Sequence, residues 1–180
     1  EFLEEIGVSA YKVASADLTN MPLIERLVDT GKPLILSTGM STLEEIKFTA
    51  SVLKKSNCEF TFLHCNSTYP APLEDINLSW INELKKIHSN VGYSGHERGT
   101  SVTIAAVAMG ISIIERHFTL DRNMEGPDHP ASLEFDEFAS MVEGVRDVEA
   151  ALGSPAQERS LSQGEMINRE NLSKSIVAAS

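Results

Sequence analysis

The chain has 180 residues, 42% hydrophobic and 23% charged, which is enough to build one sizeable hydrophobic core. Its formal net charge of −11 disfavours nucleic acid and anionic membranes as main partners, because both attract basic surfaces. The sequence contains no run of about 20 apolar residues and starts without a signal-peptide pattern, so we expect a cytoplasmic protein without a membrane partner.

Short apolar runs alternate with amphipathic segments along the chain. The predicted strands cover residues 11–15, 33–38, 60–65, 91–94 and 112–118. The predicted helices cover residues 21–30, 42–55, 77–88, 100–109 and 135–152. Capping residues mark several helix ends: a capping box of Thr42 with Glu45, N-caps at Asn77 and Thr100, and C-terminal glycines at Gly31, Gly110 and Gly153.

Strands that alternate with helices predict right-handed βαβ units around a parallel sheet. Either an open doubly wound sheet or part of a (β/α)₈ TIM barrel would satisfy this pattern. No glycine-rich phosphate loop follows a strand, which disfavours the nucleotide-binding open sheet. Polar residues instead occur at the carboxyl ends of all five strands, and in a barrel these ends form the rim that carries the active site. The sequence therefore favours an α/β fold of the TIM-barrel type.

The number of βα units is smaller than a whole barrel requires. A (β/α)₈ barrel typically needs about 250 residues, whereas this chain shows five units. We expect residues 1–153 to form roughly the last five βα units of a barrel. Residues 154–180 leave this rhythm, and we expect them to be a linker and the start of a second domain.

Two histidines lie at the ends of the last two predicted strands. The period of two places Glu115 and His117 on one face of their strand, and Ser94 and His96 share a face in the preceding one. Neutral imidazoles are common ligands of divalent metals, so His96 and His117 could bind one ion. Hydrogen-bonded structural histidines are the alternative. Asp128, in the loop after the last strand, could add a carboxylate or could simply initiate the turn around Pro127.

A second group combines one lysine with hydroxyl groups at strand ends. A lysine with nearby hydroxyls suits a phosphate or a carboxylate, because the ammonium supplies charge and the hydroxyls supply directed donors. Alternatively, the lysine stem covers apolar surface and the serines bind local backbone. The residues of this group are Lys12, Ser15, Ser37 and Ser94.

The stretch "FLHCNSTYP" ends the third predicted strand with polar residues. Asn66, Ser67 and Tyr69 are available to a hydroxylated ligand, and His64 could join them or be buried against backbone. Cys65 has no neighbour in sequence that marks an activated thiolate, so a structural thiol is favoured. With Cys58 as the second cysteine, the chain cannot form a disulfide framework, and free thiols are expected.

Six motifs in order resemble the N-acetylneuraminate (sialic acid) synthase family: "KVASADLTN", "KPLILSTGMSTLEEI", "LHCNSTYPAPLEDINL", "VGYSGHERG", "IERHFTLDRNMEGPDHPASLE" and "NRENLSKSIVAA". The resemblance extends over essentially the whole chain. It implies a TIM barrel followed by an antifreeze-like (SAF) domain, and a homodimer. The implied reaction condenses phosphoenolpyruvate with an N-acetylated amino sugar such as N-acetylmannosamine, releases phosphate, and uses Mn²⁺ or Mg²⁺.

The resemblance also implies a role for each candidate residue. His96 and His117 match the metal ligands, and Glu115 and Asp128 match active-site carboxylates. The residues that match the phosphoenolpyruvate site are Lys12, Ser15, Ser37, Ser67 and Ser94, and those on the sugar side are His64, Asn66 and Tyr69. Two positions depart from the commoner pattern: Asp17 replaces a glutamate, and Gly95 stands where an aspartate is frequent. These departures bear on the choice of sugar more than on the type of reaction.

Three functional hypotheses remain open at the level of sequence. The first is a synthase of sialic acid, or of the related legionaminic or pseudaminic acids. The second is a metal-dependent aldolase or hydrolase on a similar barrel, which would share the histidine pair without needing to accept phosphoenolpyruvate. The third is a non-catalytic partial barrel that serves in assembly. The implied missing N-terminal units contribute further active-site groups in the family, so this chain alone is expected to have little or no activity.

Overall fold

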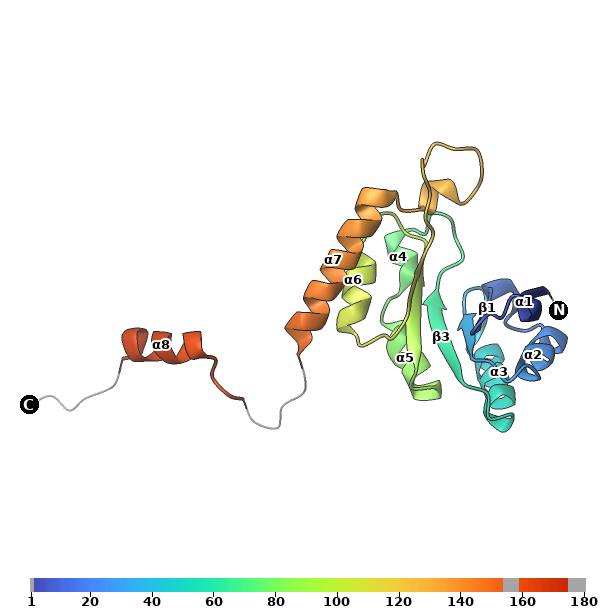
Figure 1. Cartoon of the computed structure of the whole chain (residues 1–180), viewed down its shortest axis with the longest axis horizontal. Coiled ribbons are helices and arrows are strands. Elements are labelled where there is room, and N and C mark those ends of the chain that lie inside the picture. The colour runs from blue at the N-terminus through green and yellow to red at the C-terminus, as the bar shows by residue number, and fades with distance from the viewer. Residues whose placement is uncertain (1, 154–158, 175–180) are drawn as a thin grey trace, which may run out of the picture.

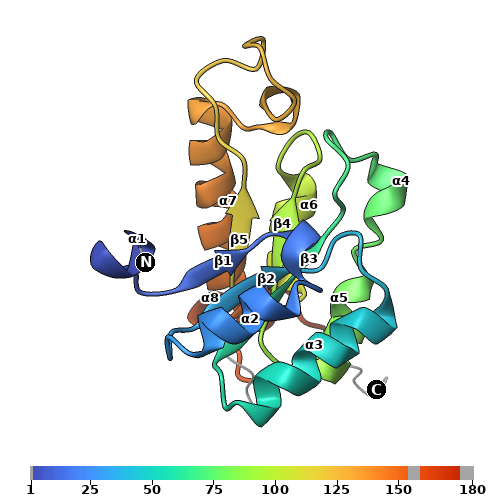
Figure 2. The ribbon, with the colours of Figure 1, turned by 90° about the vertical axis from the view of Figure 1, so that its right-hand side faces the viewer.

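Five parallel strands, paired in the order of the sequence, form the centre of the molecule. In the computed structural model, which describes residues 2–153 and 159–174, the strands are β1 (Tyr11–Val13), β2 (Leu34–Ser37), β3 (Phe60–Cys65), β4 (Val91–Gly95) and β5 (Ile114–Arg116). Each strand pairs with the next one along the chain (Figure 2). Neighbours in sequence are thus neighbours in space, as the βαβ pattern predicts.

Helices follow every strand and pack along one face of the sheet. The α-helices are α1 (Phe2–Glu5), α2 (Met21–Val28), α3 (Leu43–Lys55), α4 (Leu73–Ile76), α5 (Trp80–Ile87), α6 (Ser101–Ala108), α7 (Phe135–Leu152) and α8 (Gln163–Leu172). Two short 3₁₀ helices span Ser15–Asp17 and His129–Ala131. Figure 1 shows α6 and α7 at one end of the sheet, α2 and α3 at the other, and α5 between them.

The hydrophobic core lies between the sheet and these outer helices. Alternate strand residues such as Leu36, Phe62 and Tyr93 face the helices and are almost completely buried. On the helix side, Ile24 and Leu53 are fully buried against them. The side chains at the remaining alternate positions of each strand point to the inner side of the curved sheet. These features confirm the prediction of five βα units of a TIM barrel.

Local signals explain where most helices begin and end. The predicted capping box of Thr42 and Glu45 is present at the start of α3. Gly31, Gly110 and Gly153 all have positive φ angles just after a helix, a conformation that glycine adopts without steric cost. Thr100 occupies the N-cap position of α6, although its side chain makes no capping hydrogen bond.

The predicted helix over residues 77–88 is wrong in its first part. Within this range the structure has α5, which begins at Trp80; the separate helix α4 ends at Ile76, and Asn77 is its C-cap in the left-handed region with φ of 46°. Asparagine tolerates this conformation better than most residues, so it breaks the helix instead of starting one. The first and last strands are also shorter than predicted, since Ser15 enters a 3₁₀ helix and β5 has only three residues.

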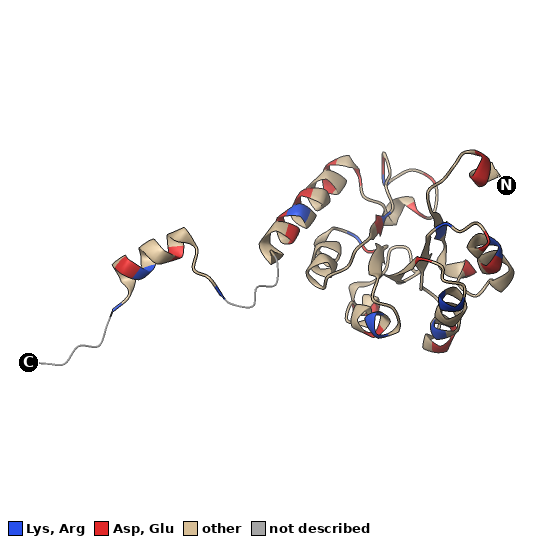
Figure 3. Cartoon of the chain, turned by 60° about the horizontal axis from the view of Figure 1, so that its bottom comes forward, with Lys and Arg blue, Asp and Glu red and all other residues tan. Residues whose placement is uncertain are grey.

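The predicted linker and second domain at residues 154–180 stay a prediction. Within this stretch the structure describes residues 159–174, which contain α8, and the remaining positions lie outside the described residues. No helix within residues 2–153 and 159–174 is long and apolar enough to cross a membrane. Figure 3 shows acidic and basic residues spread over the helices, with both signs on α7.

We expect truncation of Leu53 to destabilise the fold far more than truncation of Leu73. Leu53 in α3 is 0% exposed, whereas Leu73 in α4 is 63% exposed. Leu53→Ala should lower the free energy of unfolding by about 2–5 kcal/mol, because a cavity remains where the side chain packed. Leu73→Ala should change it by about 0.5 kcal/mol or less. Urea unfolding followed by circular dichroism measures both, and equal losses would contradict this assignment of the core.

Candidate active site

A cavity of about 370 Å³ lies over the carboxyl ends of the five strands. In parallel strands these ends meet at one rim, where the active sites of TIM barrels are built. Most of the polar residues singled out from the sequence converge here. The lining residues are Lys12, Ala14, Ser15, Ala16, Ser37, Met40, Cys65, Ser67, Tyr69, Ser94, His96, Glu115 and His117.

The two histidines lie side by side in this cavity. The ring centroids of His96 and His117 are 5.0 Å apart, and their planes are nearly perpendicular at 87°. Tyr69 covers both of them, with its ring centroid 4.1 Å from that of His96 and 5.4 Å from that of His117. The structure therefore brings together a histidine pair and an aromatic ring from three different segments of the chain.

The bonding of His96 suits a metal ligand. Its Nδ1 atom lies 2.7 Å from the backbone carbonyl of Asn66, and this bond orients the ring and leaves Nε2 available. For His117, burial and then the charge of His96 lower the pKa, which favours the neutral imidazole that metals bind. Among the residues that the structure describes, no group of three or more histidine, cysteine or acidic side chains is arranged to hold a metal ion. Within this cavity, His96 and His117 are the two residues that could hold a divalent ion.

Glu115 is held by two neighbours at the rim. Ser94 and Glu115 are register partners on β4 and β5, and the Ser94 hydroxyl donates to Glu115 Oε1 at 2.7 Å. The ammonium of Lys12 lies 3.5 Å from Glu115 Oε2 and donates at 2.8 Å to the carbonyl of Val13. Because both charged side chains are about one-third exposed, a ligand can reach the ammonium and the carboxylate together.

The remaining serines gather around the loop that follows β2. Ser15 Oγ accepts a hydrogen bond of 3.2 Å from the backbone N–H of Gly39. A side chain at Gly39 would collide with the hydroxyls of Ser15 and Ser67, so glycine allows the two serines to close around this loop. Ser37 is 2% exposed, and its hydroxyl has no hydrogen-bond partner within the described part of the chain. A buried hydroxyl without a partner is uncommon and is available to a ligand.

Cys65 is a cavity residue that the sequence analysis treated as structural. Its Sγ atom lies 3.6 Å from Ser15 Oγ and 3.8 Å from His96 Nδ1. Burial opposes ionisation, but hydrogen bonds from His96 and Ser15 outweigh it and lower the pKa of the thiol. Strand parity groups Cys65 with Thr61 and Leu63 on one face of β3, but no polar alternation in this strand shows which face looks into the cavity.

His64 and Asn66 do not reach the main cavity. The side chain of His64 faces the opposite side of β3, where its Nε2 lies 2.7 Å from the carbonyl of Ile76 and burial lowers the pKa of the ring. The amide of Asn66 donates to the carbonyl of Asp75 and accepts from the backbone of Thr68. Both residues line a smaller neighbouring cavity of about 170 Å³. The geometry of His64 matches the alternative of a buried histidine bonded to backbone.

Asp128 lies at the edge of the site and does not line the cavity. It precedes the 3₁₀ helix at His129, and its carbonyl accepts hydrogen bonds from Ala131 and Ser132. Its carboxylate nevertheless influences the site: after burial and Cys65, Asp128 is the next cause that raises the pKa of Tyr69. This position is compatible with both interpretations from the sequence, namely that Asp128 initiates a turn and that it adds a carboxylate near the site.

Comparison with known proteins places these features in context. Human N-acetylneuraminate-9-phosphate synthase is 44% identical over 180 residues, which are 99% of this chain and 50% of that protein. The N,N'-diacetyllegionaminic acid synthase of Campylobacter jejuni is 41% identical over 182 residues, 99% of this chain and 54% of that protein. The chain thus spans about half the length of the curated relatives it matches.

A solved structure shows the same arrangement of the backbone. N-acetylneuraminic acid (sialic acid) synthetase from Leptospira borgpetersenii serovar Hardjo-bovis, in complex with citrate, superposes with a TM-score of 0.85 at 39% sequence identity. The match covers 94% of this chain and 60% of that one. The sequence also matches the NeuB family over residues 1–157, which is most of its length. The chain belongs to the NeuB family.

Proposed function

We propose that this chain supplies the substrate site of a synthase that joins phosphoenolpyruvate to an N-acetylated amino sugar and releases phosphate. The observation that carries the proposal is the convergence of one lysine, four serines and two histidines on a single cavity. Because the chain spans about half the length of its curated relatives, the activity is assigned to the complete gene product that contains it.

Phosphoenolpyruvate has a phosphate and a carboxylate, and the cavity offers donors for both. Lys12 provides a positive charge at the rim, and the unpartnered hydroxyl of Ser37 provides a buried donor. Ser15 and Ser67 flank the loop at Gly39, whose backbone approaches closely. These groups would bind the two anionic groups and so hold C3 of the substrate toward the sugar, a positioning effect that can supply several kcal/mol, up to about 7–11.

His96 and His117 would hold the divalent ion, Mn²⁺ or Mg²⁺. When bound, such an ion supplies positive charge that polarises the aldehyde oxygen of the open-chain sugar. The two histidines are fit for this because His96 Nδ1 is already engaged by the Asn66 carbonyl and the rings lie 5.0 Å apart. Tyr69, whose ring is tilted against that of His96, would form the wall against which the sugar binds.

Glu115 would orient the water that completes the reaction. A new bond forms between C3 of phosphoenolpyruvate and the aldehyde carbon, whose oxygen takes up a proton. Water then adds to C2 and gives up a proton, and the C2–O bond to phosphate breaks. Glu115, held by Ser94 and adjacent to Lys12, is placed to accept the proton of this water. Asp128 could assist from the loop beyond β5.

The acceptor sugar is proposed only as a class. Relatives are named both as N-acetylneuraminate-9-phosphate synthase and as N,N'-diacetyllegionaminic acid synthase. N-acetylmannosamine, its 6-phosphate and N-acetylated diamino sugars are therefore the substrates to test. Sugar contacts by His64 and Asn66, the homodimer, the antifreeze-like domain and the cytoplasmic location stay predictions.

Substitution of either histidine should slow phosphate release strongly. In the complete gene product with Mn²⁺, we expect His96→Ala and His117→Ala to slow phosphate release from phosphoenolpyruvate and an N-acetylated amino sugar by at least about 100-fold, because loss of the ion removes several kcal/mol of charge stabilisation. A colorimetric phosphate assay measures this directly. His88→Gln is the matched control, since His88 binds the carbonyl of Phe60 away from the cavity.

Two results would refute the proposed function. One is near-normal phosphate release after complete removal of divalent metal with a chelator. The other is the absence of sugar-dependent phosphate release from the wild-type protein with all three classes of acceptor.

Ser37→Ala should weaken phosphoenolpyruvate binding without loss of stability. The Ser37 hydroxyl has no partner among the described residues, so its removal breaks no hydrogen bond of the fold. A hydrogen bond to a charged group contributes about 1.5–3 kcal/mol, so the dissociation constant of phosphoenolpyruvate should rise about 10- to 100-fold. Calorimetric titration and thermal melting measure the two quantities. A lower melting temperature with unchanged affinity would show that Ser37 is structural; Ser51→Ala, on an outer helix, is the control.

A further inference from the structure

The two histidines lie just beyond the hydrogen-bonded ladder of β4 and β5. The last paired residues of these strands are Gly95 and Arg116, and His96 and His117 each follow by one position. The ladder itself therefore does not fix the distance between the two imidazoles. Interactions beyond the ladder therefore contribute to the positions of both residues: the backbone carbonyls of His96 and His117 accept hydrogen bonds from Ala71 and Leu133.

A buried ion pair connects the two strand ends on the side away from the cavity. The side chains of Arg116 and Glu97 are 0% and 1% exposed, and Arg116 Nη1 lies 2.8 Å from Glu97 Oε1. Arg116 also donates at 2.6 Å to the backbone carbonyl of Glu97 and at 3.0 Å to that of Gly99. The guanidinium of Arg116 thus binds both the carboxylate of Glu97 and the backbone carbonyls of the segment that follows His96.

Two neutral side chains also donate hydrogen bonds to the Glu97 carboxylate. Tyr93 on β4 donates its hydroxyl at 2.8 Å to Oε2, and Thr103 on α6 donates at 3.3 Å to Oε1. Thr103 also accepts from Arg116 Nη1 at 2.8 Å. Such a network fixes position more than it adds stability, because burying both charges costs about as much as their attraction returns.

The glycine at position 95 is what makes room for this network. A Cβ atom at Gly95 would lie 2.7 Å from Glu97 Oε2 and 2.7 Å from the ring of Tyr93, and 3.0 Å from the side chain of Arg116. Real Cβ atoms essentially never show contacts as short as the two of 2.7 Å, so a side chain here would force Glu97 or Tyr93 to move. Gly95 and the buried Glu97 are thus coupled features of the segment "YSGHE".

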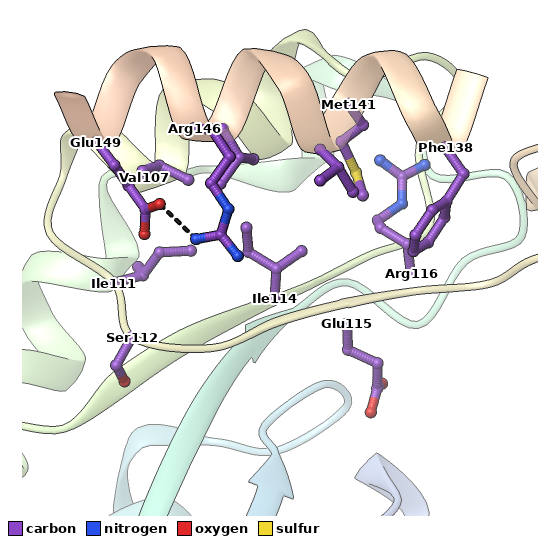
Figure 4. A pocket seen from close by; sticks show the side chains of 12 residues that line it. Val107, Ile111, Ser112, Ile114, Glu115, Arg116, Phe138, Met141, Arg146 and Glu149 are labelled. Atoms are coloured by element: carbon purple, nitrogen blue, oxygen red, sulfur yellow. Dashed lines mark hydrogen bonds and ion pairs between the residues drawn. The ribbon is translucent and has the colours of Figure 1, made fainter. Parts of the chain in front are cut away.

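Arg116 lies between two cavity residues but points the other way. Figure 4 shows Glu115 on one side of β5 and Arg116 on the other, where the guanidinium lies among side chains of α7 such as Phe138 and Met141. Arg116 and these α7 side chains line a separate cavity of about 460 Å³. It is larger than the cavity of the candidate active site, and most of the residues that line it are apolar. The ion pair therefore lies on the side of β5, and of the segment after β4, that is opposite to the candidate active site.

We propose that the Arg116–Glu97 pair is a positioning device that sets the separation of His96 and His117 and thereby the affinity of the site for a divalent ion. The inference rests on the proposed function, because it assumes that these two histidines bind the metal. It predicts a selective effect. Lys12, Ser15 and Ser37 come from β1, β2 and their loops, and do not contact the ion pair, so phosphoenolpyruvate binding should be largely independent of it.

The experiment compares Mn²⁺ binding and phosphoenolpyruvate binding in the complete gene product, with Mn²⁺ followed by electron paramagnetic resonance. Two variants disrupt the pair: Glu97→Gln keeps the shape but removes one charge, and the double change Glu97→Met with Arg116→Met removes both. Loss of an indirect support of a metal ligand typically weakens binding 10- to 100-fold, so the Mn²⁺ dissociation constant should rise about tenfold or more. That of phosphoenolpyruvate should change by less than about twofold. Arg146→Ala, which breaks an exposed pair with Glu149, is the matched control.

The outcomes separate this inference from the proposed function. If the wild-type protein binds Mn²⁺ and loses it in His96→Ala, but both pair variants bind it normally, the positioning role is overturned and the proposed function stands. If the wild type binds no Mn²⁺, the proposed metal site fails and the inference falls with it. A parallel loss of both affinities would show a general structural role and would also overturn it. Should the double variant not fold, Glu97→Gln decides alone.

Discussion

In-register pairing of five parallel strands is the constraint on which the candidate site depends. The cavity residues extend from Lys12 to His117 in sequence, and those on different strands have no local reason to meet one another. Parallel pairing in chain order brings every carboxyl end to one rim, and the register places Ser94 opposite Glu115. If β4 slipped by one residue, the parity of the whole strand would invert and the hydroxyl would leave the carboxylate.

The same strands serve two environments through the alternation of their side chains. On β4, Tyr93 faces the helices while Ser94 faces the cavity, and on β5 Arg116 and Glu115 divide in the same way. The outer side is therefore both the core of the fold and the support of the site. In this arrangement each residue of the buried ion pair is covalently next to a cavity histidine: Glu97 follows His96, and Arg116 precedes His117.

The electrostatics of the cavity differ from those of the whole chain. The net charge is −11, so an anionic substrate must be held against the overall field by local groups. Among the residues that line the cavity, Lys12 is the one lysine or arginine, and Glu115 lies 3.5 Å away. For a pair one-third exposed, this attraction contributes about 0–1 kcal/mol. An incoming phosphate or carboxylate can therefore compete for the ammonium at little cost, while the serines supply the directed hydrogen bonds.

The sequence by itself determined the order of strands and helices, the rim at which polar residues gather, and the pairing of His96 with His117, because these follow from periodicity and from motifs. It could not decide which face of β3 looks into the cavity. All six residues of β3 are buried, so no polar alternation distinguishes the side of Cys65 from that of His64. Only the tertiary structure showed that His64 faces outward, that Asn66 acts on His96 through its backbone, and that Glu97 meets Arg116 19 residues away along the chain. These outcomes depend on packing between segments distant in sequence, which no local pattern records.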